Sequence, residues 1–98
     1  MKRYIRSNST PANANAKKIA KETFGTWYNE QDQVKIFKQS SGYAVKYYAY
    51  TPEEAEKILE DMIGTANYFD IPVIKSFTKL GFLGSAHYYV ACVIVPAA

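Results

Sequence analysis

The sequence predicts an α+β fold in which two helices pack on an antiparallel sheet of four to five strands. Two stretches carry apolar residues at helical spacing, and aromatic and β-branched residues gather in pairs of short segments separated by turns. These elements follow one another as helix, strand pair, helix and strand pair, an order typical of α+β folds. With 98 residues, 48% of them hydrophobic, the chain suits one globular domain over 1–98.

The N-terminal part predicts a helix that begins at Pro11. Residues 1–10 contain a candidate short strand, Lys2 to Arg6, followed by a polar loop. Thr10 is suited to cap the helix, and proline is favoured at the first helical position. Gly25 is expected to end the helix or weaken its last turn. The apolar face comprises Ala12, Ala16, Ile19, Ala20, Thr23, Phe24 and Trp27.

A β-hairpin is predicted from Gln33 to Gln39 and from Tyr43 to Tyr50, with Ser40-Ser41-Gly42 as the turn. Side chains alternate between the two faces of a strand, so the apolar pattern fixes the register. The predicted core face carries Val34, Ile36, Val45 and Tyr47. The other face carries Lys35, Phe37, Lys46, Tyr48 and Tyr50, which are the candidate binding residues.

The second helix has the strongest local signal in the chain. Thr51 is its predicted N-cap, Pro52 occupies the first helical position, and Glu54 stands where a capping box requires an acidic residue. The expected buried stripe comprises Ala55, Ile58, Leu59, Met62, Ile63 and Ala66, while the carboxylates of this helix face water.

Two further strands are predicted, from Ile71 to Leu80 and from His87 to Val95. The loop between them contains Gly81 and Gly84, and we expect Phe82 and Leu83 to tuck onto the core. The last strand, HYYVACVIV, is apolar at both alternating positions, which is typical of a strand covered on both faces. Something should therefore cover the second face of the sheet.

With the candidate strand at Lys2 to Arg6, the elements follow the order β-α-β-β-α-β plus one strand, which resembles the ferredoxin-like arrangement. This is the preferred topology. Without that strand the order is α-β-β-α-β-β, which is the fallback.

No constellation of residues predicts catalysis, a metal site or a cofactor, so a non-enzymatic protein is expected. The only histidine, His87, and the only cysteine, Cys92, are five residues apart on one predicted strand. Their odd spacing sends them to opposite faces, so they cannot form a dyad. A lone cysteine suits a reducing compartment, and no apolar run approaches the length of a membrane helix. We expect a cytoplasmic protein with no membrane contact.

The segment Gly42-Tyr43-Ala44-Val45-Lys46-Tyr47-Tyr48 resembles the RNP1 strand of RNA recognition motifs at Gly42, Tyr43, Ala44 and Tyr48. The resemblance implies that Tyr43, together with Tyr4 on an RNP2-like strand, stacks on RNA bases. Three positions depart from the pattern. Ser41 replaces a basic residue, Val45 an aromatic residue and Lys46 an apolar residue, and Lys46 would then point into the core.

Charge and aromatic content both favour a binding protein. Residues 1–50 carry a balance of +6, whereas residues 51–98 carry −3, which favours oriented docking on a partner. Tyrosine-rich surfaces are typical of protein interfaces, so the leading hypothesis is a homodimeric adaptor or inhibitor that docks on another protein. The alternative is binding of RNA or single-stranded nucleic acid on the aromatic and basic face. The size and the opening MKRYIR also look like those of phage and mobile-element accessory proteins.

Overall fold

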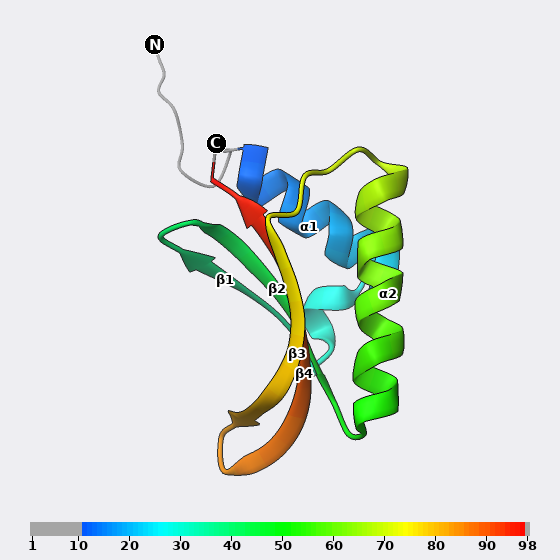
Figure 1. The fold of residues 1–98 in the computed structure, drawn as a ribbon, viewed down its shortest axis with the longest axis vertical. Coiled ribbons are helices and arrows are strands. Elements are labelled where there is room, and N and C mark those ends of the chain that lie inside the picture. Colours follow the sequence, from blue (N-terminus) through cyan, green and yellow to red (C-terminus); the bar gives the residue numbers. More distant parts are fainter. Residues whose placement is uncertain (1–10, 98) are drawn as a thin grey trace.

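The computed structural model describes residues 11–97 and shows an α+β fold with two helices on one face of a four-stranded antiparallel sheet (Figure 1). This confirms the predicted fold class. In chain order the elements are α1 (Pro11–Phe24), the 3₁₀ turn η2 (Tyr28–Glu30), β1 (Val34–Gln39), β2 (Gly42–Ala49), α2 (Pro52–Tyr68), β3 (Lys75–Leu83) and β4 (Ala86–Pro96).

The described elements follow the fallback order α-β-β-α-β-β, and the sheet order is β1-β2-β4-β3. The preferred ferredoxin-like order needs a strand before α1, and Lys2 to Arg6 lie outside the described residues. In the preferred topology that first strand would lie between β2 and β3, whereas in the structure β4 lies there. β4 is apolar on both sides, so a central position buries more of its surface than an edge position would.

The predicted register of the first hairpin is confirmed. Val34 lies opposite Tyr47 and Ile36 lies opposite Val45, and all four side chains pack in the core beneath the helices. That core also receives Ile19 from α1, Met62 from α2 and Val93 from β4, all fully buried. The hydrophobic pattern of β1 and β2 therefore determines which face of each strand meets the helices.

The first helix ends earlier than the apolar pattern suggested. Gly25 follows its last residue with a φ of 100°, and its N–H donates to the Lys21 carbonyl at 2.8 Å. This left-handed conformation is the usual reason for glycine after a helix. Trp27 consequently lies beyond the helix and is exposed, so its predicted place on the buried face of the helix is wrong.

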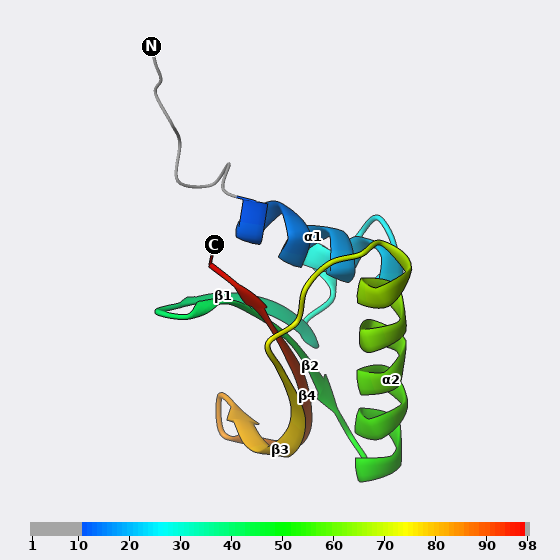
Figure 2. The same ribbon diagram turned by 45° about the horizontal axis from the view of Figure 1, so that its top comes forward.

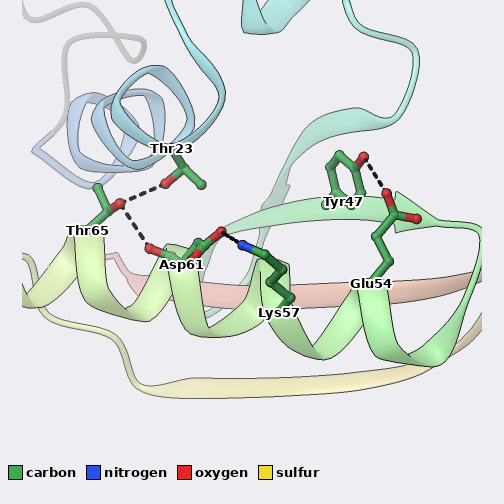
Figure 3. Close-up of polar contacts among 6 residues, drawn as sticks. All are labelled: Thr23, Tyr47, Glu54, Lys57, Asp61 and Thr65. Carbon is green, nitrogen blue, oxygen red and sulfur yellow. Dashed lines mark hydrogen bonds and ion pairs between the residues drawn. The ribbon is translucent and has the colours of Figure 1, made fainter.

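Polar contacts fix α2 against α1 and β2 (Figure 3). The Thr23 hydroxyl donates to Thr65 Oγ1 at 2.9 Å, which joins the two helices, and the Thr65 hydroxyl donates to the Asp61 carbonyl at 3.0 Å. At the other end of α2, the Tyr47 hydroxyl donates to Glu54 Oε2 at 3.3 Å. Burial and the nearby Glu54 carboxylate both raise the pKa of Tyr47, which keeps its hydroxyl protonated as the donor.

The N-terminus of α2 is capped largely as predicted. Thr51 accepts a hydrogen bond from the Glu54 N–H at 3.1 Å. The Glu54 carboxylate reaches back to the N–H of Tyr50 at 2.9 Å, one residue before the cap. The capping pair therefore joins the helix to the end of β2.

Replacing Thr51 by alanine should lower the free energy of unfolding by about 1 kcal/mol, because the Glu54 N–H loses its acceptor. Urea unfolding followed by circular dichroism measures this difference. Thr26→Ala, in the turn after α1, is the matched threonine control and should stay within about 0.5 kcal/mol of the wild type. Equal losses in the two variants would contradict the capping role.

β3 and β4 form a hairpin that extends three residue pairs beyond the end of β2, from Gly81↔Tyr88 to Leu83↔Ala86. β3 starts at Lys75, four residues later than predicted, and it includes Gly81. The turn is at Gly84, which has a φ of 65°. Phe82 is exposed rather than tucked onto the core. The end of the hairpin curls away from the helices (Figures 1 and 2).

Candidate binding face

The side of the sheet turned away from the helices is called the open face. No described helix lies over it, and both hairpin loops project to this side (Figures 1 and 2). Lys35, Phe37, Lys46 and Tyr48 all lie on the open face, as predicted from the alternation of β1 and β2. Tyr50 follows β2, with its ring 5.6 Å from that of Tyr88.

The strand registers arrange the open face in rows. One row runs Phe37, Ala44, Ile94, Lys75 across the four strands, and the next runs Lys35, Lys46, Cys92, Phe77. The third row includes Tyr48, Val90 and Lys79. The small side chains of the central strands thus lie between long and aromatic side chains on the two outer strands.

Lysine ammonium groups of the open face gather over its phenylalanine rings. Lys46 Nζ is 5.1 Å from the centroid of Phe37. Lys75 Nζ and Lys79 Nζ are 5.4 and 5.6 Å from the centroid of Phe77. Such cation–π contacts hold the ammonium groups at the surface, next to the ring faces.

The sheet carries positive charge only. The four strands contain Lys35, Lys38, Lys46, Lys75 and Lys79 and no aspartate or glutamate. Five of the nine carboxylates of the chain are on α2, on the opposite side of the molecule. The open face is therefore basic and α2 is acidic, which favours a negatively charged partner on the sheet.

The centre of the open face is less exposed than the sequence suggested. Cys92 is fully buried, and Val90 and Ile94 are nearly so. Ala44, Cys92 and Ile94 form a small cluster, against which Phe77 packs. The centre of the open face is therefore buried within the chain itself, without a second copy or another protein. What remains accessible is mainly the lysines and the outer rings.

The predicted aromatic residues differ in what they offer a ligand. Phe37 is 41% exposed and Tyr50 is 66% exposed, whereas Tyr48 is only 6% exposed and packs edge-on against Tyr88. Burial raises the pKa of Tyr48. Phe37 and Tyr50 can therefore receive a planar ligand, while Tyr48 supports the face from within.

Cys92 and His87 lie on opposite sides of β4, as their spacing predicted. His87 contacts Phe82 on the helix side, with ring centroids 4.6 Å apart, and Cys92 belongs to the open-face cluster. Burial raises the pKa of the Cys92 thiol, although Lys46, Lys79 and Lys75 act in the opposite direction. The thiol is therefore a weak nucleophile in the folded protein.

The resemblance to RNP1 fails on its register. Tyr43 and Val45, which would have to face RNA, lie on the helix side and pack against the main core. Lys46, which the resemblance would place inside, lies on the open face over Phe37. Tyr4 lies outside the described residues.

Four residues of the open face were not predicted from the sequence: Lys75, Phe77, Lys79 and Tyr88. The alternation of lysine and phenylalanine in KSFTKLGFL was a usable signal. The pattern did not show which face of this strand points away from the helices, because Leu80 and Phe82 on the other face are as apolar as Phe77. At the β1 edge of the sheet, a separate depression is lined by Lys17, Tyr28, Asn29, Val34, Lys35 and Ile36.

Within residues 11–97, no three His, Cys, Asp or Glu side chains are grouped so that they could hold a metal ion. None of the described helices is long and apolar enough to cross a membrane. Comparison of the chain with protein-family models found no match, and comparisons with curated proteins and with solved structures found none either. The function must therefore be inferred from the charge and geometry of the open face.

Proposed function

We propose that the protein binds single-stranded nucleic acid on the open face of its sheet. The observation that carries this proposal is the combination of Lys35, Lys46, Lys75 and Lys79 with the accessible rings of Phe37 and Tyr50 on a face without a carboxylate. Lysines contact phosphates and rings stack on bases, which is the chemistry of proteins that bind single strands. A lone cysteine suits the cytoplasm, where we propose that this binding occurs.

The lysines of the open face repel one another in the free protein. Lys35 and Lys46 stand directly opposite each other in the β1–β2 register, and like charges in that position destabilise a sheet. Lys75 and Lys79 converge on the same ring. A chain of phosphates would relieve this repulsion, so bound nucleic acid gains free energy beyond the individual contacts.

A single strand suits this face better than a duplex does. Its bases are unpaired and can lie on the rings of Phe37 and Tyr50, with each stacked base contributing about 1–3 kcal/mol. In a duplex the bases are already stacked, and only the phosphates would remain available to the lysines.

The homodimeric adaptor or inhibitor inferred from the sequence remains a prediction. The lysines of the open face restrict which surface could form the dimer. Two copies docked open face to open face would bring eight lysines together with no carboxylate between them. Coulomb repulsion opposes that arrangement. Self-association, if it is to coexist with nucleic-acid binding, needs a different surface.

Titration of fluorescein-labelled U₂₀ and dT₂₀ at about 50 and 200 mM salt tests the proposed function. Four phosphate contacts predict that the affinity falls about fiftyfold over this range, because bound counterions are released from the strand. A self-complementary oligonucleotide of 20 nucleotides that folds into a hairpin duplex should bind at least about fivefold more weakly than U₂₀, because its paired bases cannot stack on the protein rings.

Heparin serves as the control for charge alone, since it is a polyanion without bases. If heparin binds as tightly as U₂₀ at equal charge concentration, base stacking plays no part and the proposal fails. It fails equally if neither oligonucleotide binds at 50 mM salt.

A further inference from the structure

The outer half of β3 carries exposed apolar side chains on the side opposite the open face. Leu80 is 71% exposed and Phe82 is 66% exposed, and Tyr89 lies beside Leu80 on β4. These residues belong to the part of the hairpin that the helices do not cover (Figure 2). Large apolar side chains gathered on the surface of a small protein typically mark a contact surface.

β3 is also an edge strand, and among the described residues 11–97 no strand pairs with its outer side. Successive residues of an antiparallel strand direct these groups to alternate sides. The Tyr48 N–H donates to the Gln33 carbonyl at 2.8 Å, so the odd-numbered residues of β2 face β4. In the β2–β4 register, odd-numbered residues of β2 pair with odd-numbered residues of β4, so the backbone groups of the even-numbered residues of β4 point toward β3. These pair with odd-numbered residues of β3, so the backbone groups of the even-numbered residues of β3 point toward the free edge.

The backbone groups at the free edge are therefore those of Ser76, Thr78, Leu80 and Phe82. The Ile94 carbonyl agrees with the assignment for β4, because it accepts a hydrogen bond from the N–H of Ile74, the residue before β3. The side chains of Leu80 and Phe82 thus lie next to unpaired backbone groups on the same strand. This combination fits an added β-strand with an apolar face.

We propose that two copies of the chain pair antiparallel through β3, with the twofold axis at Leu80. The two Leu80 residues then exchange backbone hydrogen bonds. Thr78 lies opposite Phe82 of the second copy on both sides of the axis. A small residue faces a large one twice, so the strand is complementary to itself, as a twofold interface requires.

The charges on β3 favour this alignment over the one shifted by a single residue. With the axis at Leu80, Lys79 lies opposite Gly81 of the second copy, which leaves room for the lysine and brings no like charge. With the axis one residue earlier, the two Lys79 side chains would face each other directly, and like charges in that position are destabilising.

Edge pairing leaves both open faces on the same side of one continuous eight-stranded sheet, because the twofold axis is perpendicular to the sheet. Each copy keeps its own lysines and rings accessible. The proposed dimer does not depend on the proposed nucleic-acid binding. If both hold, one dimer would cover twice the length of single strand that a monomer covers.

Light scattering after size-exclusion chromatography, from about 1 to 500 μM, should show a monomer–dimer equilibrium. Leu80→Asp should weaken the dimer at least about tenfold, because it places two carboxylates at the axis. Tyr68→Asp is the matched control, since Tyr68 is 81% exposed on α2 and should leave the equilibrium unchanged. Thermal melting verifies that both variants fold.

Amide hydrogen exchange measured by NMR separates this interface from any other. In the dimer the amides of Thr78, Leu80 and Phe82 should become protected as concentration rises, while those of Lys79 and Gly81 are protected in monomer and dimer alike. A strict monomer at 500 μM, or a dimer in which Thr78 and Leu80 exchange freely, would overturn the proposal. Neither result bears on oligonucleotide affinity, which the salt titration measures separately.

Discussion

The double substitution Lys46→Glu with Lys75→Glu is expected to lower the affinity for U₂₀ about a hundredfold at 50 mM salt. Lys46 lies over Phe37 in the middle of the open face, and Lys75 lies at its outer edge beside Phe77. Each reversal removes one phosphate contact and adds one repulsive charge. The slope of log affinity against log salt should fall by about two, since each lost contact lowers it by about one.

The matched control reverses Lys21 and Lys57, which lie on α1 and α2. Both double variants change the net charge equally, so a general charge effect would reduce both affinities alike. We expect the control to retain affinity within about threefold of the wild type. Equal losses in the two variants would mean that the whole molecule, and not the open face, attracts the strand.

The folded stability of the open-face variant should not suffer. Lys46 stands opposite Lys35, so Lys46→Glu replaces a repulsive cross-strand pair by an attractive one. The melting temperature of the variant is expected to equal or exceed that of the wild type. A loss of affinity can then be assigned to binding rather than to unfolding.

The first hairpin shows how far the sequence alone could define the candidate site. In β1 and β2, apolar residues alternate with lysines, so only one register buries Val34, Ile36, Val45 and Tyr47. All five predicted binding residues consequently lie together on or beside the open face. The sequence did not reveal that Tyr48 is buried, because its exposure depends on Tyr88 from a distant strand.

The second hairpin was harder to orient because both faces of β3 and β4 are apolar. Leu80 and Phe82 have the composition of a core face, yet they are exposed. The end of the hairpin extends past the part of the sheet that the helices cover, which leaves these side chains exposed. Its length depends on which residues of β3 and β4 pair, and the local sequence pattern does not specify that pairing. The same long-range pairing places β4 between β2 and β3, which determines the topology.

Gly42→Ala is expected to have the largest effect on stability of any single methyl group added to the sheet. Gly42 has a φ of 150°, and a Cβ at this position would lie 1.8 Å from the Val95 carbonyl oxygen. The Ala97 N–H donates to the Ser41 carbonyl at 3.0 Å, so β4 is held close to this turn. The added methyl group must push the end of β4 away from β2.

We expect Gly42→Ala to lower the free energy of unfolding by about 3 kcal/mol or more, from backbone strain together with displacement of β4. For a domain of this size the melting temperature should fall by about 15 °C. Calorimetry or a thermal melt followed at 222 nm measures the change. A fall smaller than about 1 kcal/mol would mean that the end of β4 yields freely, and that the close pairing around Gly42 does not stabilise the sheet.

The same substitution in α2 should act in the opposite direction. Gly64 lies inside the helix, and a Cβ there meets nothing within 4 Å. Gly64→Ala removes conformational freedom from the unfolded chain without creating a clash, so it should raise the free energy of unfolding by about 0.5–1 kcal/mol. Because one methyl group is added in both variants, opposite signs can arise only from the backbone geometry at the two positions, which places the strain at the junction of the β1–β2 turn with β4.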